Sequence, residues 1–132
     1  MPRRATILIL NQSPSQLELD PESTQLWRGE LKDGVDTEVP GVIPSGGFIV
    51  IRCKSTGFPQ CIEGAVTCRI EGHAPHDSVR FIWKSRYFLR DVYKAETSRE
   101  GFTVDVEGGG GARAVVLFVF SKYDDVCICT FV

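Results

Sequence analysis

The feature that most constrains the fold is a series of short segments in which apolar and polar side chains alternate. In segment 64–71 every second residue is apolar, which turns one side of an extended chain toward a core. These apolar residues are Val66, Cys68 and Ile70. Segment 78–84 repeats the pattern, and the polar residues 72–77 between the two segments indicate a turn. We therefore expect a hairpin of two half-buried strands here.

Other segments with strand character are separated by turn residues along the chain. They lie at 5–10, 16–19, 48–53, 101–106 and 113–120. The first two are expected to pair as a hairpin, and four consecutive glycines form the turn between the last two. No window of helical length carries a continuous apolar stripe. Short strands without helices predict an all-β fold, a sandwich or a barrel, and we expect a β-sandwich.

Chain length and composition bound the architecture and the class of partner. With 132 residues, of which 42% are apolar, we expect one domain, 1–132, with its core at about 5–120 and a C-terminal strand or tail at 121–132. Fifteen Lys and Arg oppose seventeen Asp and Glu, so the overall charge favours neither nucleic acid nor an anionic bilayer as a partner. Any partner must therefore be recognised by a local surface.

Neither a signal peptide nor a membrane span is expected. The N-terminal apolar run 5–10 is too short for a signal peptide and lacks a small-residue cleavage site. The longest apolar run, 114–120, is far shorter than the roughly 20 residues that a membrane-spanning helix requires. We expect a soluble protein, cytoplasmic or secreted by a non-classical route, that reaches a membrane as a peripheral protein.

Metal, cofactor and catalytic sites find little support in the sequence. The five cysteines, which we expect to be reduced, are Cys53, Cys61, Cys68, Cys127 and Cys129. Cys127 and Cys129 could join the two histidines, His73 and His76, but their spacing matches no common zinc pattern. The glycine run is not followed by the Lys-Ser or Lys-Thr of a phosphate loop. With no nucleophile elbow and no distinctive acid pair, we expect no metal, no cofactor and no enzymatic activity.

One stretch interleaves aromatic and basic side chains. Its aromatic residues are Phe81, Trp83, Tyr87, Phe88 and Tyr93, and its basic residues are Arg80, Lys84, Arg86, Arg90 and Lys94. Phe81 and Phe88 are compatible with core packing, with the cations reaching water. Tyr87 and Tyr93 follow the predicted strand in a charged loop, where such rings suit a water–lipid boundary or a choline-type headgroup.

With the strands placed, the order of motifs resembles that of the aegerolysins. The corresponding elements are Ile7 to Asn11, Trp27 to Leu31 before Asp33-Gly34, Ile43 to Cys53, Glu63-Gly64, and Phe81-Ile82-Trp83 with the aromatic loop that runs to Tyr93. The resemblance spans about 6–120 and implies a single-domain β-sandwich of the aegerolysin and actinoporin type. Arg86 and Phe88 stand where the family usually has proline and glycine, so the headgroup pocket is expected to differ.

The resemblance implies lipid recognition without catalysis. Family members bind a sphingolipid such as ceramide phosphoethanolamine, or sphingomyelin with sterol, and some recruit a larger membrane-attack-type protein that forms the pore. This chain would then be the lipid-binding component of a two-component cytolysin. The residues carried over are Trp27, Glu63, Trp83, Tyr87 and Tyr93. Glu63 would accept a hydrogen bond from a headgroup amine or a sterol hydroxyl.

Other interpretations stay open for these residues and for the fold. Trp27 is also compatible with core packing, and Glu63 with a structural role in a turn. A self-sufficient pore former of the actinoporin type would need an amphipathic N-terminal helix, whereas the residues before Asn11 have strand character. A carbohydrate-binding lectin or a protein interaction module could use the same fold and the same aromatic residues.

Overall fold

All regular elements of the described chain are β-strands. The computed structural model describes residues 2–20, 23–36, 41–74 and 76–123, without the side chains of 32–36. The strands are β1 (Arg4–Asn11), β2 (Leu17–Leu19), β3 (Gln25–Arg28), β4 (Glu30–Asp36), β5 (Val42–Ile43), β6 (Phe48–Lys54), β7 (Ile62–Ile70), β8 (Ser78–Ser85), β9 (Val92–Thr97), β10 (Phe102–Gly108) and β11 (Arg113–Lys122). No helix long and apolar enough to cross a membrane occurs in these ranges.

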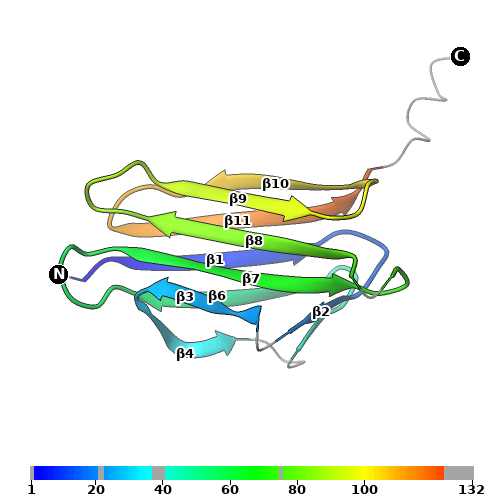
Figure 1. The fold of residues 1–132 in the computed structure, drawn as a ribbon, viewed down its shortest axis with the longest axis horizontal. Coiled ribbons are helices and arrows are strands. Elements are labelled where there is room, and N and C mark those ends of the chain that lie inside the picture. Colours follow the sequence, from blue (N-terminus) through cyan, green and yellow to red (C-terminus); the bar gives the residue numbers. More distant parts are fainter. Residues whose placement is uncertain (1, 21–22, 37–40, 75, 124–132) are drawn as a thin grey trace, which may run out of the picture.

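The strands form two sheets that face each other, as predicted for a β-sandwich. One sheet has the order β10-β11-β1-β6-β4, and the other has the order β5-β2-β7-β8-β9 with β3 also paired to β7. Figure 1 shows the second sheet lying over the first, with most strands running along the long axis of the molecule. The connecting loops therefore gather at its two ends.

The core lies between the sheets and is built from the alternating residues of each strand. The predicted hairpin of β7 and β8 is confirmed, and Val66, Cys68 and Ile70 are fully buried. Phe81 of β8 meets Phe118 of β11 at 5.4 Å between ring centroids, so aromatic packing joins the two sheets. Each fully buried side chain of this size contributes on the order of 2 kcal/mol to the hydrophobic stabilisation.

The predicted hairpin between the first two strands is wrong. β1 lies in one sheet, between β6 and β11, whereas β2 lies in the other, between β5 and β7. The buried side chain of Asn11 holds the chain where it crosses, because its Nδ2 donates to the Ser15 and Ile43 carbonyls at 2.7 and 3.0 Å. The alternation of a strand shows which face is buried but not which strand lies beside it.

The loop that was expected to reach Tyr93 is shorter than predicted. β9 begins at Val92 and pairs with β8, so that Tyr93 lies opposite Trp83. The predicted glycine turn between β10 and β11 is confirmed by their antiparallel pairing. Cys127 and Cys129, considered above as zinc ligands, lie outside the described residues.

Candidate functional site

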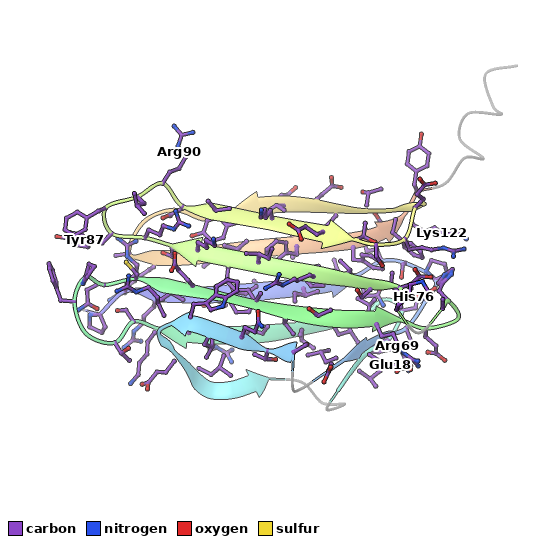
Figure 2. All side chains as sticks on the ribbon, in the orientation of Figure 1. Glu18, Arg69, His76, Tyr87, Arg90 and Lys122 are labelled. Atoms are coloured by element: carbon purple, nitrogen blue, oxygen red, sulfur yellow. The ribbon has the colours of Figure 1, made fainter. Side chains whose placement is uncertain are left out.

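One end of the sandwich carries a cluster of exposed apolar side chains. Phe58, in the loop between β6 and β7, is 75% exposed. Tyr87, Phe88 and Leu89, in the loop between β8 and β9, are 52, 71 and 66% exposed. Figure 2 shows Tyr87 at this end of the molecule and Lys122 and His76 at the other. We call these four residues the apolar tip.

The rings of the apolar tip contact one another across the two loops. The centroids of Tyr87 and Phe88 lie 4.6 Å apart, and Phe58 lies 5.9 Å from Tyr87 and 6.4 Å from Phe88. Tilted and edge-on aromatic pairs at such distances are favourable. The loops therefore present one joint apolar surface rather than separate exposed rings.

Polar contacts at its base hold the 86–91 loop in place. Asp91 accepts a hydrogen bond from the Arg86 backbone N–H at 2.8 Å, which closes the loop. The Arg86 guanidinium is held in turn by Glu63 of β7, with an Nε to Oε1 distance of 2.9 Å. Both partners of this ion pair have side chains that are only 20% exposed. A partly buried, charge-assisted contact of this kind fixes the loop to the sheet.

Arg3 links the N-terminal segment to the loops at this end. Its Nε donates to the Gln60 carbonyl at 3.0 Å, and its guanidinium also donates to the Gly111 carbonyl at 2.6 Å. A third, longer contact of 3.4 Å reaches the Ser85 hydroxyl at the end of β8. One guanidinium therefore ties together three connections of the sandwich, as its planar set of donors permits.

A pocket of about 190 Å³ opens beside the apolar tip. Its lining residues are Arg28, Pro59, Cys61, Glu63, Arg86, Phe88 and Leu89. Two guanidinium groups and one carboxylate thus share a small hollow with apolar walls. Such a set can bind an anionic group on the guanidinium side and a cationic or hydroxyl group on the carboxylate side.

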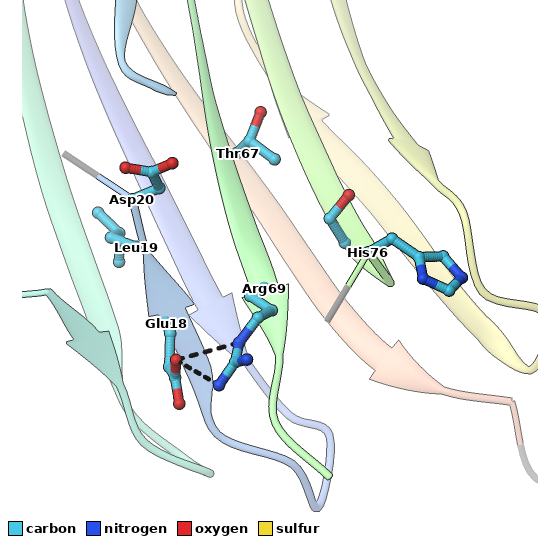
Figure 3. Close-up of a pocket in the computed structure, with 7 residues that line it drawn as sticks. Glu18, Leu19, Asp20, Thr67, Arg69 and His76 are labelled. Atoms are coloured by element: carbon cyan, nitrogen blue, oxygen red, sulfur yellow. Dashed lines mark hydrogen bonds and ion pairs between the residues drawn. The ribbon is translucent and has the colours of Figure 1, made fainter. Parts of the chain in front are cut away.

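A larger hollow of about 420 Å³ lies on the same sheet near the opposite end (Figure 3). The Glu18 and Arg69 side chains that line it are paired with each other at 2.9 Å. Its remaining lining residues are Leu19, Asp20, Thr67, His76 and Ser78. Of the two hollows, only the smaller one borders the cluster of exposed rings.

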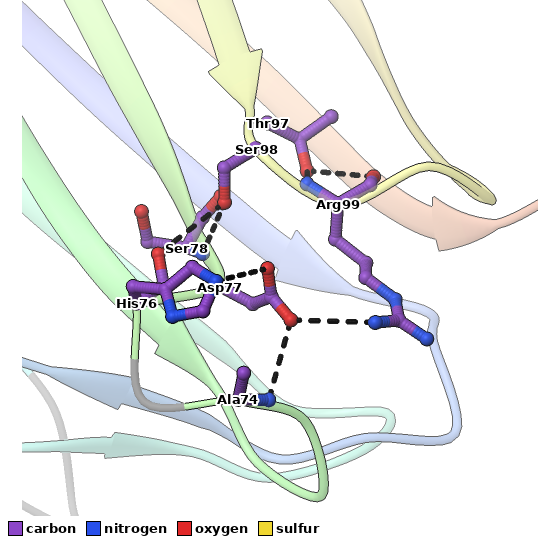
Figure 4. A network of polar contacts seen from close by, with 7 residues as sticks. All are labelled: Ala74, His76, Asp77, Ser78, Thr97, Ser98 and Arg99. Carbon is purple, nitrogen blue, oxygen red and sulfur yellow. Dashed lines mark hydrogen bonds and ion pairs between the residues drawn. The ribbon is translucent and has the colours of Figure 1, made fainter.

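The end opposite the apolar tip is closed by polar contacts. Figure 4 shows Asp77, which is 5% exposed, accepting a hydrogen bond from the Ala74 N–H at 3.2 Å and meeting Arg99 at 3.4 Å. His76 Nε2 lies 3.9 Å from the same carboxylate. These contacts join the β7–β8 turn to the β9–β10 turn. The two ends of the sandwich are therefore chemically different.

Trp83 does not lie at the surface, which corrects its predicted place among the lipid-contacting residues. It is fully buried, because it shares the inward face of β8 with Val79 and Phe81. Its Nε1 makes no hydrogen bond of ordinary geometry among the described residues. Burial raises the pKa of the neighbouring Cys53 thiol to about 12, while the Trp83 indole acts in the opposite direction and lowers it.

Tyr93 packs against the glycine turn between β10 and β11 and does not belong to the apolar tip. It lies in β9 and is half-buried, which corrects the prediction that it stands in a charged loop. Its ring packs so closely on Gly109 that a Cβ there would lie 2.4 Å from Tyr93 Cε2. Burial raises the pKa of the phenol, the nearby Asp91 carboxylate raises it further, and its hydroxyl meets Asp91 at 3.3 Å.

Trp27 lies on the outer face of the second sheet, 48% exposed. The Arg80 guanidinium and the Lys84 ammonium of β8 lie 5.5 and 5.7 Å from its ring centroid. Ile82, between these two cations on the same face, is only 5% exposed, as expected if the indole covers it. The interpretation of Trp27 as a core residue is therefore wrong, and its ring lies on the outer face of the sheet, outside the apolar tip.

The predicted residues meet only in part. Glu63 and Tyr87 lie at the end that carries the apolar tip, whereas Trp83 lies in the core and Tyr93 packs against Gly109 of the glycine turn. Phe58 was missed, although an aromatic residue inside the turn cluster Ser55 to Pro59 was a signal for an exposed ring. Phe88, which was considered for the core, is exposed at the tip.

Comparisons with known proteins show a likeness in fold. No family model matches the sequence, and no curated protein matches it. Among solved structures, RahU protein, an aegerolysin-like protein crystallised in complex with a Tris molecule, superposes with a TM-score of 0.69. The match covers 92% of this chain and 96% of that chain at 13% sequence identity. At this identity the likeness shows the fold alone, so the chain shares the β-sandwich fold of RahU protein.

Proposed function

We propose that this protein binds a lipid membrane surface end-on, through the apolar tip, and acts in lipid recognition rather than catalysis. The observation that carries the proposal is the joint exposure of Phe58, Tyr87, Phe88 and Leu89 at one end of a sandwich. A single exposed apolar residue is ordinary, whereas a contiguous cluster on a water-soluble surface marks an interaction site. Tyrosine and other aromatic rings are well suited to the boundary between water and hydrocarbon.

The size of the apolar tip predicts binding of moderate strength. Complete burial of one such side chain contributes roughly 1.5–3 kcal/mol, and all four are already partly buried, at 52 to 75% exposed. We therefore expect about 4–6 kcal/mol from the tip before ordering costs are subtracted. A single myristoyl chain binds membranes about as well, and stable attachment requires a second contribution. The pocket beside the tip offers one.

The pocket suits the headgroup of a sphingolipid that carries both charges. Arg28 can hold the phosphate, while Glu63 can accept a hydrogen bond from an amine or from a sterol hydroxyl. Ceramide phosphoethanolamine, or sphingomyelin with sterol, is the lipid class that the family resemblance implies. Within the same proposal, this chain is the lipid-binding component of a cytolysin whose pore is formed by a larger membrane-attack-type protein.

The proposal is tested by sedimentation with vesicles of phosphatidylcholine that contain either of these sphingolipid mixtures. The double variant Phe58→Ser/Phe88→Ser should bind at least tenfold more weakly, since roughly 1.4 kcal/mol of lost burial suffices for that change. Phe48→Ser is the matched control, because Phe48 is 60% exposed at the far end of β6. Equal binding by all three proteins, or sedimentation with no vesicle, would contradict end-on lipid binding.

A carbohydrate-binding lectin or protein interaction module is the alternative, and the exposed indole of Trp27 favours it. The flat ring lies on the outer face of the sheet and is 48% exposed, as a stacking surface for a sugar would be. Binding to a glycan array that Trp27→Ala abolishes, without binding to any vesicle, would support this alternative over the lipid proposal.

A further inference from the structure

The end that carries the apolar tip is strongly basic, although the chain as a whole is acidic. The connections at this end, with the two strand residues on either side of each, are 2–5, 27–31, 53–63, 84–93 and 107–114. They hold eight Lys and Arg against four Asp and Glu, a formal charge of +4. The whole chain carries −2, so the remaining residues sum to −6. A neutral or zwitterionic surface would not require this separation.

Most carboxylates at this end are already engaged, which leaves several cations without one. Glu30 pairs with Lys54 at 3.0 Å, and Glu63 pairs with Arg86. Asp91 accepts the hydrogen bond that closes the 86–91 loop.

Four exposed arginines at this end have no carboxylate within 4.0 Å among the described residues, and we call them the basic collar. They are Arg4, Arg28, Arg90 and Arg113.

The basic collar includes a pair of arginines that repel each other. Arg4 of β1 and Arg113 of β11 are register partners on adjacent parallel strands. The residues that follow them, Ala5 and Ala114, are buried, so both arginines point to the outer face of their sheet. Like charges in such positions destabilise the folded protein unless an anion lies nearby. Their arrangement therefore suits an anionic partner outside the chain.

The basic collar surrounds the apolar tip from both sheets. Arg4 and Arg113 stand on the sheet of β1 and β11, whereas Arg28 and Arg90 stand on the side of β3 and β9. Figure 2 shows Arg90 projecting from the same end as Tyr87. A flat surface that meets the tip end-on would be reached by cations on both sides. A partner bound to one face of a sheet would reach only half of them.

We infer that the membrane recognised by this protein carries anionic phospholipids, which the basic collar contacts while the apolar tip enters the interface. The inference rests on the proposed function and adds to it the net charge of the lipid surface. Each Lys or Arg beside an anionic leaflet strengthens binding about fivefold, and the effect fades within a Debye length of about 10 Å at 0.1 M salt. The collar arginines lie at the same end as the tip, which is the end that would face the leaflet.

The test compares vesicles of phosphatidylcholine and sphingolipid with the same vesicles containing phosphatidylserine. We expect phosphatidylserine to strengthen binding by at least tenfold at about 0.1 M salt and the gain to vanish at about 1 M salt. Arg90→Gln should lose part of the gain, and Arg90→Gln/Arg113→Gln should lose a larger part. Lys122→Gln, which removes one positive charge at the opposite end as Arg90→Gln does at this end, should keep the gain. If circular dichroism shows that the double variant is unfolded, Arg90→Gln is tested alone.

The outcomes separate this inference from the proposed function. Equal binding to both vesicles, independent of salt and of the Arg90 and Arg113 substitutions, would overturn the anionic requirement while leaving end-on lipid binding intact. The inference would also be overturned if Lys122→Gln and Arg90→Gln reduced the gain in binding equally, because the effect would then depend on the total charge and not on where the charge lies. Sedimentation with neither vesicle would overturn the proposed function and this inference with it.

Discussion

Substitution of Trp83 distinguishes a role in the core from a role in lipid contact more clearly than any other change. Trp83→Ala removes a fully buried indole and should lower the free energy of unfolding by about 3–5 kcal/mol. Since a domain of this kind is stable by only about 5–15 kcal/mol, the variant should unfold at markedly lower urea concentration. A loss of vesicle binding in Trp83→Ala would therefore say nothing about lipid contact.

Trp83→Phe is the informative variant. The smaller ring leaves a void of a few tens of cubic ångströms, which at ~24 cal/mol per Å³ costs roughly 1 kcal/mol. The substitution also removes Nε1, a buried donor without a hydrogen bond of ordinary geometry, whose presence costs about 1–3 kcal/mol. These opposing effects should leave Trp83→Phe no more than about 1 kcal/mol less stable than the natural chain.

Urea unfolding followed by circular dichroism measures both variants, and vesicle sedimentation is then run on Trp83→Phe. We expect its binding to be unchanged, because the ring lies between the sheets and away from the apolar tip. A folded Trp83→Phe that no longer sediments with vesicles would refute the assignment of Trp83 to the core. A stability loss as large as that of Trp83→Ala would show that Nε1 has a strong acceptor.

Two further predictions concern the glycine turn and the buried thiols. Gly110→Ala should lower the free energy of unfolding by about 1 kcal/mol, because Gly110 has a left-handed backbone conformation and open space around it. Gly109→Ala should lower it by at least about 1 kcal/mol more, because the added Cβ would also overlap the Tyr93 ring. Thermal unfolding of the two variants measures the difference. Burial raises the pKa of Cys53 and Cys68 from 9.0 to about 12, so the folded thiols keep protons that unfolded thiols release. The free energy of unfolding should therefore fall between pH 9 and pH 12, by about 1.4 kcal/mol per pH unit for each thiol. Urea unfolding across this range should show a smaller decrease for Cys68→Ala, which has lost one of the two thiols.

The sequence predicted the faces of the strands better than their neighbours. The alternation in 64–71 and 78–84 is enough to identify a hairpin, because the two segments share one short turn. The parallel pairing of β1 with β11 joins residues more than a hundred positions apart, and nothing in either segment indicates the other. β3 and β4 were not predicted, because Gly29 and the charged residues around it are not typical of strands. These segments are extended because β3 pairs with β7 and β4 pairs with β6.

The candidate site was predicted in its place but not in all its members. The two tryptophans show why, since both were expected at a lipid surface and only Trp27 is exposed. Trp83 continues the inward face set by Val79 and Phe81, and that alternation could have assigned it to the core. Phe58 and Phe88 come together from loops thirty residues apart, and only the fold shows that these loops share one end.

A sandwich restricts where an exposed apolar surface can form, and this explains why the tip and the collar share one end. Along the strands, cross-strand pairing and the alternation of faces commit most apolar side chains to the core. At the strand ends this constraint stops, and loops can present rings such as Phe58 and Phe88 without exposing the core. Arg3 holds the surrounding connections together, so the tip is ordered before any partner arrives. Binding then loses little conformational entropy, and a tip of only four side chains can suffice when the charges beside it contribute as well.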